Sequence, residues 1–253
     1  MIIYGINPVL EALKAKRVTR VRVSARSDAR MDDVLALAGV QRVPVERADA
    51  QALDRAARGG VHQGVVAEIK DPEEYGVEDL VLPREDASAG SVAPLLVVLD
   101  GIEDPHNVGA ILRTCDAAGA TGVIRQTRHA AALDGVVGKA SAGALASARI
   151  ATVVNIARAV EALKSANVWT IGLAGDGDED YTDVDWTLPS ALVLGAEGIG
   201  LRRLVRETCD RIVRIPMYGT VDSLNVSVAA GVVLYEAVQQ RKGDTDGRAQ
   251  GRR

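Results

Sequence analysis

Aromatic residues are scarce in this chain of 253 residues, which has no phenylalanine and only 3% of Phe, Trp and Tyr together. Proteins that read single-stranded RNA on an open β-sheet stack its bases on aromatic side chains, so that class of RNA-binding protein is disfavoured. Cysteine is also rare. The two cysteines, Cys115 and Cys209, are too few for a disulfide scaffold and have no metal-ligand spacing with the three histidines. We therefore expect two small core residues and no metal site.

Long apolar runs are missing as well. No segment approaches the roughly 18 apolar residues of a membrane span, and the N-terminus lacks a basic region followed by a long apolar one. These absences predict a cytoplasmic protein with no membrane partner. Two nucleotide signatures are missing too, because Gly195-x-x-Gly198-x-Gly200 does not match G-x-G-x-x-G and no G-x-x-x-x-G-K-[ST] occurs. A dinucleotide or ATP enzyme is thus disfavoured.

The formal net charge of −4 argues at first against a nucleic-acid partner. The acidic excess, however, is concentrated in residues 71–92, which hold seven acidic residues and one arginine. A basic stretch precedes it, formed by Lys14, Lys16, Arg17, Arg20, Arg22, Arg26 and Arg30 with Asp28 as its one acidic member. This stretch is either a phosphate-facing patch or a solvated face of a small domain, and charge alone favours neither.

Local patterns divide the chain into two domains. Strand patterns at 20–23, 42–45 and 65–69 and a helical stretch at 31–38 predict a small α/β domain over residues 1–72. Residues 73–92 are rich in Pro, Gly, Ser and acid, which predicts an exposed linker. The second domain spans 93–242, and the polar tail 243–253 is expected to be disordered.

The second domain has the pattern of a parallel sheet. Apolar runs at 95–99, 122–124, 150–153, 168–173, 191–194 and 212–215 alternate with helical patterns. Such alternation predicts an α/β fold in which helices cover both faces of a mostly parallel sheet. A last helix from about 224 to 240 is apolar nearly all round as far as 233, so we expect it to be buried.

Three of the predicted strands end in unusual loops. In open α/β sheets, ligands bind beyond the carboxyl ends of the strands. The loops follow Leu99, Leu194 and Ile215, and they carry Asn107-x-Gly109-x-x-x-Arg113, then Gly195-x-Glu197-Gly198-x-Gly200, then Pro216-Met217-x-Gly219-x-x-x-Ser223-Leu224-Asn225. Each alone has a structural explanation: Asn107 as a helix cap, Arg113 on an exposed helix face, and 195–200 as a tight turn.

Together, the three loops resemble in order and spacing the three motifs of the SpoU-type RNA ribose 2'-O-methyltransferases of the SPOUT superfamily. The resemblance covers roughly residues 95 to 240. Two further segments, Tyr4-Gly5-Ile6-Asn7-Pro8-Val9 and Val61-His62-Gln63-Gly64-Val65, resemble the branch with an added RNA-binding domain. That branch includes enzymes that methylate a guanosine of large-subunit (23S) ribosomal RNA.

The resemblance implies a deep trefoil knot in the C-terminal domain, a homodimer, and S-adenosylmethionine as methyl donor. By position it implies that Gly195, Ile215 and Leu224 contact the donor, largely through backbone groups. It makes Arg113, Asn107, Glu197, Ser223 and Asn225 the candidates for catalysis. A guanidinium is almost never deprotonated in proteins, so we expect Arg113 to clamp a phosphate and stabilise the forming alkoxide.

Two other functions remain open at this point. A transfer-RNA guanosine methyltransferase of the same family would have the same chemistry on a different target, although the N-terminal domain favours ribosomal RNA. A non-catalytic RNA-binding or ribosome-assembly protein would keep the fold but would not need Arg113, Glu197, Ser223 and Asn225 together.

Overall fold

The structure, a computed structural model, describes residues 1–25, 29–70, 74–82 and 93–250. The chain forms two compact units. Unit 1 comprises Met1–Glu73, Asp104–Arg113 and Ala131–Ala148, and unit 2 comprises Glu74–Glu103, Thr114–Ala130 and Arg149–Arg253.

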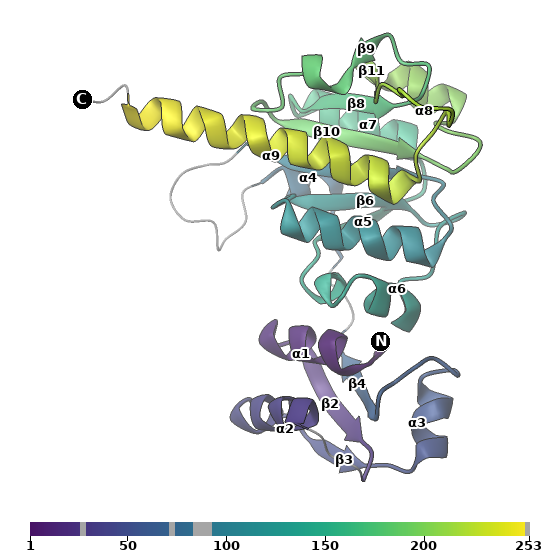
Figure 1. Cartoon of the computed structure of the whole chain (residues 1–253), viewed down its shortest axis with the longest axis vertical. Coiled ribbons are helices and arrows are strands. Elements are labelled where there is room, and N and C mark those ends of the chain that lie inside the picture. The colour runs from purple at the N-terminus through teal and green to yellow at the C-terminus, as the bar shows by residue number, and fades with distance from the viewer. Residues whose placement is uncertain (26–28, 71–73, 83–92, 251–253) are drawn as a thin grey trace. The chain divides into compact units, whose positions relative to one another are not determined.

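Unit 1 is built on a four-stranded sheet in the order β1-β4-β2-β3 (Figure 1). Its strands are β1 (Ile2–Tyr4), β2 (Val18–Val23), β3 (Val45–Arg47) and β4 (Val65–Ile69). Strand β4 runs antiparallel to both β1 and β2, whereas β3 runs parallel to β2. The helices of the unit are α1 (Ile6–Lys14), α2 (Ala29–Val40), α3 (Ala50–Ala56), α6 (Gly135–Ala140) and the 3-10 turn η1 (Ala144–Ala146). The expected small α/β domain is thus present.

Three of the seven basic residues in the basic stretch of unit 1 pair with carboxylates. Arg22 pairs with Glu68 and also lies 3.8 Å from Glu46, while Arg20 lies 3.5 Å from the same Glu46. Lys14 pairs with Glu11 at 2.7 Å. Arg26 lies outside the described residues. Both interpretations of this stretch, as a solvated face and as a phosphate-facing patch, therefore stay predictions.

Unit 2 holds a seven-stranded sheet in the order β7-β6-β5-β10-β8-β11-β9, in which every neighbouring pair is parallel (Figure 1). The strands are β5 (Leu95–Asp100), β6 (Gly122–Gln126), β7 (Ile150–Val153), β8 (Trp169–Leu173), β9 (Glu179–Asp180), β10 (Ser190–Gly195) and β11 (Arg211–Arg214). All residues of β5 and β10 are buried, as expected for central strands of a parallel sheet. The six predicted apolar runs therefore correspond to β5, β6, β7, β8, β10 and β11.

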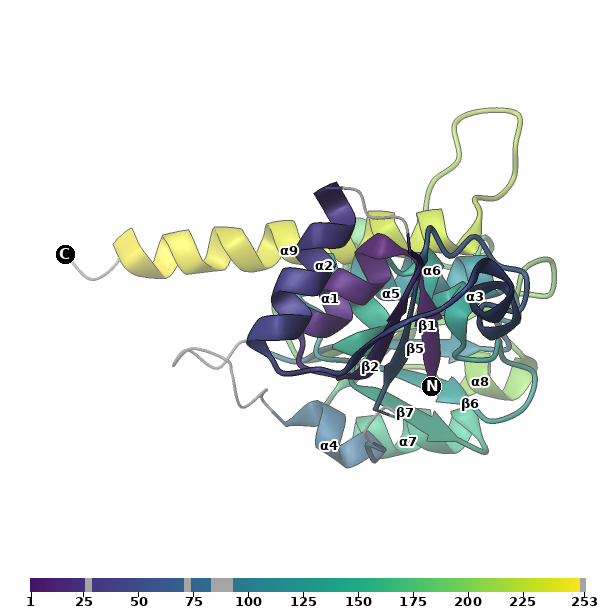
Figure 2. The same ribbon diagram turned by 90° about the horizontal axis from the view of Figure 1, so that it is seen from below.

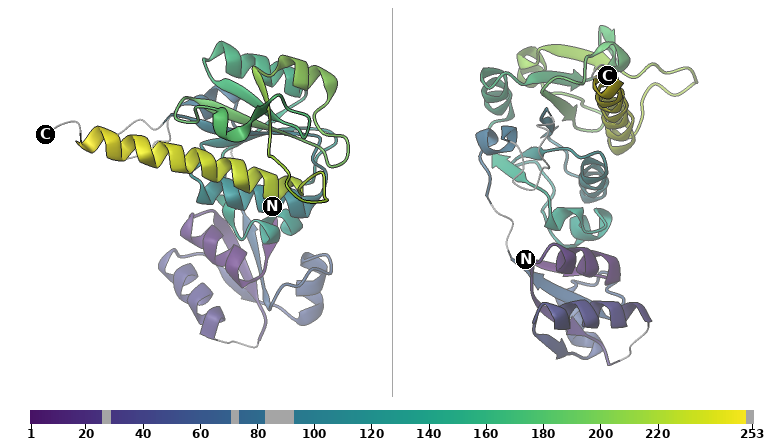
Figure 3. Two further views of the ribbon diagram at one scale, coloured as in Figure 1. Left: turned by 45° about the horizontal axis from the view of Figure 1, so that its top comes forward. Right: turned by 90° about the vertical axis from the view of Figure 1, so that its left-hand side faces the viewer.

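Helices cover both faces of this sheet (Figure 2; Figure 3). On one face α4 (Val77–Val81), α7 (Ile156–Ser165) and α8 (Arg203–Thr208) pack on a core that includes Val98, Ile124 and Val193. The long α9 (Val226–Gln250) lies on the other face. Helix α5 (Pro105–Ala117) follows β5, and a short 3-10 turn, η2 (Tyr181–Asp183), follows β9.

The expectation of an exposed linker at residues 73–92 was wrong in part. Residues 77–81 of the supposed linker form α4, because Val77 and Leu80 lie three apart on a helix and bury in the core of unit 2. Gly122 of β6 makes room for Leu80, since a Cβ there would lie 2.8 Å from it. The remaining linker residues 83–92 and the last three residues of the chain lie outside the described residues.

Helix α9 differs from the prediction in both length and burial. It continues to Gln250, through most of the tail that was expected to be disordered. Gln240 and Arg241 hydrogen-bond to the backbone of residues 184–188 and 93–94, and elongating a helix that is already fixed costs little. Its first turns are not wholly buried, because Val228 is 52% exposed and Tyr235 is 48% exposed.

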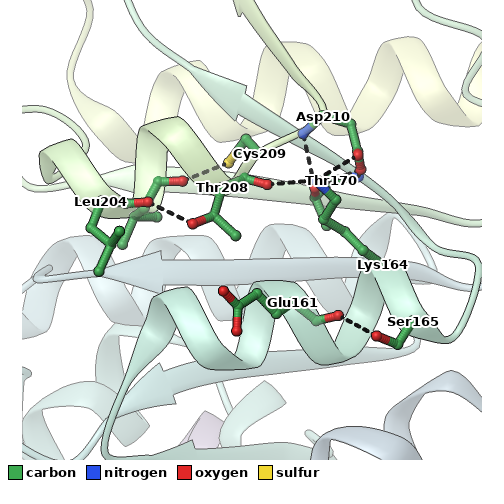
Figure 4. Close-up of polar contacts among 9 residues, drawn as sticks. Glu161, Lys164, Ser165, Thr170, Leu204, Thr208, Cys209 and Asp210 are labelled. Carbon is green, nitrogen blue, oxygen red and sulfur yellow. Dashed lines mark hydrogen bonds and ion pairs between the residues drawn. The ribbon is translucent and has the colours of Figure 1, made fainter.

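A polar cluster fixes the amino ends of β8 and β11 (Figure 4). The backbone N–H and the hydroxyl of Thr170 both donate to Asp210, at 2.9 and 2.7 Å. Lys164 pairs with Asp210 at 2.9 Å and donates to the carbonyl of Thr208 at the same distance. Burial opposes the ionisation of Asp210, but these hydrogen bonds hold the pKa of its carboxyl below the ordinary value. The cluster sets where β11 starts and thereby where the loop after it begins.

Candidate active site

A pocket of about 660 Å³ opens at the carboxyl ends of β8, β10 and β11. These three strands are neighbours in the sheet, with β8 between the other two, so their exits meet at one place. The pocket is lined by residues 173–176, 194–201, 206, 215, 217, 222–226 and 229. It therefore joins the second and third loops predicted from the sequence.

The loop after β10 is a tight turn that only glycine permits at its start. A Cβ on Gly195 would lie 2.1 Å from the carbonyl carbon of Gly200 and 2.3 Å from the nitrogen of Leu201. Gly200 closes the turn by donating its N–H to the carbonyl of Ala196 at 2.8 Å, and it has a φ of 72°. Glycine at 195 thus lets the two ends of the turn approach closely, and the turn lines the pocket.

Asn225 connects the two loops of the pocket. Its side-chain amide donates to Oε1 of Glu197 at 2.8 Å. Its oxygen accepts from the backbone N–H of Ser227 at 2.9 Å and from the hydroxyl of Ser227 at 2.6 Å, which makes Asn225 the N-cap of α9. Glu197 and Asn225 were both predicted as site residues, and the structure brings them into contact.

The remaining predicted residues of the third loop also line the pocket. Ile215 is half-buried, Leu224 is 38% exposed, and Ser223 is exposed with its hydroxyl donating to Asp222 at 3.2 Å. The loop from 215 to 225 stands out from the sheet (Figure 2), and Tyr218 near its middle is 95% exposed. Apolar side chains and an unshielded hydroxyl therefore face the same cavity.

The first loop provides Asn107 and Arg113 on α5. Asp104 accepts from the N–H of His106 at 2.9 Å and takes the place of the helix cap, so the alternative of Asn107 as the N-cap is wrong. Asn107 lies instead in the first turn of the helix and is 6% exposed. Arg113 is exposed, as expected for a residue on an exposed helix face, and its role in catalysis stays a prediction. Both residues belong to unit 1, whereas the pocket is made by unit 2.

One part of the pocket wall was missed from the sequence. Residues 173–176, at the exit of β8, line the cavity, and Asp176 pairs with Arg206 at 2.7 Å. The side-chain hydrogen bond from Arg206 holds the pKa of Asp176 below its ordinary value. The signal was present, because an apolar strand ends there in Ala-Gly-Asp-Gly just as the other exits end in glycine-rich loops.

The thiols and histidines take no part in the pocket wall. Burial raises the pKa of both Cys115 and Cys209 to about 12, so neither thiol is a nucleophile near neutral pH. Among the described residues, no group of three or more His, Cys, Asp or Glu side chains is placed to hold a metal ion. Nor does any described helix combine the length and apolar character that crossing a bilayer demands.

Comparison with known families gives two matches that together span most of the chain. Residues 94–235 match the SpoU rRNA Methylase family. Residues 2–75 match the family described as RNA 2'-O ribose methyltransferase substrate binding.

Curated relatives resemble the chain over its whole length. The 23S rRNA (guanosine-2'-O-)-methyltransferase RlmB of Pseudomonas putida is 45% identical, over 95% of this chain and 96% of its own. The protein of the same name from Pectobacterium atrosepticum is 42% identical, over 96% and 99%.

Solved structures share the fold. The SpoU methyltransferase AviRb from Streptomyces viridochromogenes, in complex with the cofactor AdoMet, aligns with a TM-score of 0.78 and 28% identity over 96% of this chain and 91% of its own. The TrmH/SpoU tRNA modifying enzyme of A. aeolicus aligns with a TM-score of 0.54 and 31% identity, over only 60% of this chain and 77% of its own.

Proposed function

Because the chain belongs to the SpoU rRNA Methylase family, we propose that it transfers a methyl group from S-adenosylmethionine to the ribose 2'-hydroxyl of a guanosine in 23S ribosomal RNA. The observation that carries this proposal is the 45% identity to a 23S rRNA guanosine methyltransferase over nearly the full length of both chains. A transfer-RNA target is less well supported, since the solved tRNA enzyme aligns with only 60% of this chain.

The pocket fits the methyl donor. Its volume of about 660 Å³ lies in the range of small-molecule sites, and its lining includes Gly195, Gly198 and Gly200, which bring backbone groups to the cavity. Gly195, Ile215 and Leu224 would hold the donor, with backbone groups meeting its polar atoms and the two apolar side chains its apolar parts. When bound, S-adenosylmethionine supplies an electrophilic methyl group on a sulfonium.

The side chains of the chain itself must handle the proton and the charge of the ribose hydroxyl. We assign Arg113 to the phosphate beside the target ribose, where its charge stabilises the forming alkoxide. We keep Asn107, which is 6% exposed in the first turn of the same helix, as a further candidate for catalysis. Ser223 orients the reacting hydroxyl from the pocket rim, and the Glu197–Asn225 contact keeps the two pocket loops in one geometry.

A labelling experiment tests the reaction. The protein is incubated with methyl-labelled S-adenosylmethionine and, separately, with unmodified 23S ribosomal RNA and a transfer-RNA pool, and the labelled nucleotide is mapped. We expect a single 2'-O-methylguanosine in 23S RNA. Label found in transfer RNA alone would show that the substrate is transfer RNA and not 23S RNA. If neither pool is labelled, the result would favour a non-catalytic RNA-binding or ribosome-assembly protein.

The role of Arg113 has its own test. Arg113→Lys keeps the positive charge but loses the planar fork that grips a phosphate by two hydrogen bonds, so kcat should fall by about 10- to 100-fold while some activity remains. Loss of all activity in a variant that still binds RNA and donor normally would contradict a purely electrostatic role.

We further assign residues 1–72 to substrate RNA binding and 93–242 to methyl transfer. The family match of residues 2–75 to a substrate-binding domain supports the first assignment. Deleting residues 1–72, which leaves α4 and its buried Val77 and Leu80 in place, should lower the affinity for RNA in a gel-shift assay, and unchanged affinity would remove the claim. Family membership also supports a deep trefoil knot in the C-terminal domain and a place in the cytoplasm with the ribosomal RNA.

We also propose a homodimer formed through α9, which would bury exposed apolar side chains of that helix. Val228 and Tyr235 are 52% and 48% exposed and lie seven residues apart, which places them on one stripe of the helix. Tyr235→Glu should turn a dimer into a monomer in light scattering. A wild-type protein that is monomeric at micromolar concentration would exclude this arrangement.

A further inference from the structure

Asp100 and Arg202 lie next to the pocket but are not part of its wall. Asp100 is the last residue of β5, and its side chain is 0% exposed. Arg202 directly follows Leu201, the last pocket-lining residue of the loop after β10. Any influence of the two side chains on the pocket must therefore pass through the loop.

The contacts between them are dense. The backbone N–H of Arg202 donates to Oδ2 of Asp100 at 2.9 Å, and its Nε donates to Oδ1 at 2.7 Å. The Nη2 group of Arg202 also contacts Asp100 and donates to the side-chain oxygen of Gln126 at 2.6 Å. Gln126 is itself 3% exposed and donates to the carbonyl of His129 at 2.8 Å.

This geometry ties both ends of the loop to one residue. Gly195, where the loop begins, is the register partner of Asp100 across the β5–β10 pair. Arg202, where the loop ends, is bound by the carboxylate of the same Asp100. A buried carboxylate is costly unless its oxygens accept hydrogen bonds. Moving Arg202 away would leave the carboxylate of Asp100 without these bonds, so the pair holds Arg202 in place.

We propose that Asp100, Arg202 and Gln126 are positioning residues that hold the backbone turn 195–201 in the shape that binds the methyl donor. Within the loop, Glu197, Gly198 and Ile199 are exposed. Its other restraints include the contact of Glu197 with Asn225 and the backbone hydrogen bond that closes the turn. The role in donor binding rests on the proposed function, whereas the positioning of the turn does not.

Adjacent arginines allow a matched test. Arg202→Lys keeps the charge but cannot reach Asp100 and Gln126 with the same fork. Arg203→Lys makes the same change one residue on, at a side chain that is 85% exposed and pairs with Glu207 at 3.1 Å. Asp100→Asn is a second variant, and Arg202→Lys keeps the test valid if Asp100→Asn does not fold.

Two measurements on the full chain decide the matter. Hydrogen exchange followed by mass spectrometry should show amides of 195–201 exchanging about tenfold faster or more in Arg202→Lys and Asp100→Asn, with no change in Arg203→Lys. Calorimetry with S-adenosylmethionine should show a Kd raised by about 10- to 100-fold in the same two variants, while the affinity for 23S RNA stays within twofold.

The outcomes separate the inference from the proposed function. Unchanged exchange at 195–201 in Arg202→Lys overturns the positioning role. Faster exchange with an unchanged donor Kd overturns its link to binding, and a loss of RNA affinity alone would make Arg202 a phosphate contact instead. If the wild type does not bind S-adenosylmethionine at all, the proposed function fails, while faster exchange would still support the positioning of the turn.

Discussion

Replacing Gly195 by alanine tests the backbone wall of the pocket most directly. The added Cβ would lie 2.1 Å from the carbonyl carbon and 2.3 Å from the oxygen of Gly200. Both are backbone atoms, so the clash cannot be relieved by rotating a side chain. An ordinary carbon contact is about 3.5 Å or more, and the turn must therefore move by at least about 1 Å.

A displacement of this size in a positioning element costs on the order of 100-fold in rate, or about 2.7 kcal/mol of transition-state stabilisation. We expect Gly195→Ala to lose that much in kcat/KM for S-adenosylmethionine, measured as initial rates of methyl transfer to 23S RNA. Calorimetry should show weaker donor binding by a similar factor. RNA affinity should be unchanged, because no new contact is made outside the turn.

The matched control is Gly39→Ala in α2, where a Cβ meets nothing within 4 Å. Alanine is favoured over glycine inside a helix by about 0.5–1 kcal/mol, so this variant should be slightly more stable and fully active. A Gly195→Ala protein that binds the donor with the wild-type Kd would refute the claim that the shape of this turn is needed for donor binding.

Three further predictions follow from other contacts. Asn225→Asp keeps the helix cap but sets a second carboxylate against Glu197, so donor binding should weaken in calorimetry, whereas Asn225→Ala should also lose about 1 kcal/mol of stability with the cap. Because the pKa of Asp210 is lowered in the folded state, its stabilising effect is complete above about pH 4 and is lost as the pH falls through the lowered value. Urea titrations should therefore show Asp210→Asn less stable by about 1–2 kcal/mol at pH 7, with the gap closing in acid, and a gap that persists there would contradict the linkage. Since burial raises the pKa of Cys209 to about 12, iodoacetamide at pH 8 should leave the folded enzyme active, and rapid inactivation would show a more reactive thiol.

The strands of unit 2 could be predicted because buried parallel strands are short apolar runs bounded by polar or glycine-rich segments. Each of the six predicted runs overlaps an observed strand of the sheet. The strand order could not be predicted in the same way. The sequence pattern of residues 190–195 does not indicate that they lie between β5 and β8, because the order of strands depends on pairing between distant segments.

Failures at element ends have a common cause. Val77 and Leu80 stand in an acidic, proline-containing segment, so composition indicated a linker, while two apolar residues at helical spacing were enough to dock it. The end of α9 was misjudged because its support comes from Arg241 and residues 93–94, which are far apart in sequence. Local pattern does not reveal such contacts.

For the site, the residues of the second and third loops were found because their types and spacing resemble a family pattern. The contact between Asn225 and Glu197, the cap on α9 and the clamp at Asp100 depend on side-chain geometry and appear only in three dimensions. Residues 173–176 were missed because the resemblance drew attention to three strand exits, although the sheet rule applies equally to the fourth.

The order of the strands also sets when the pocket can form during folding. Strand β10 is made after β5 and β8 but lies between them, and the pocket further needs residues 215–229. A nascent chain that ends before residue 190 therefore leaves β8 without its partners β10 and β11, leaves one edge of β5 unpaired, and lacks most of the pocket. Contacts between such distant segments form slowly, because long loops must close first. Binding of the methyl donor at the proposed site would therefore require that the whole C-terminal unit has folded, and a bound donor would shift that last equilibrium toward the native state by mass action.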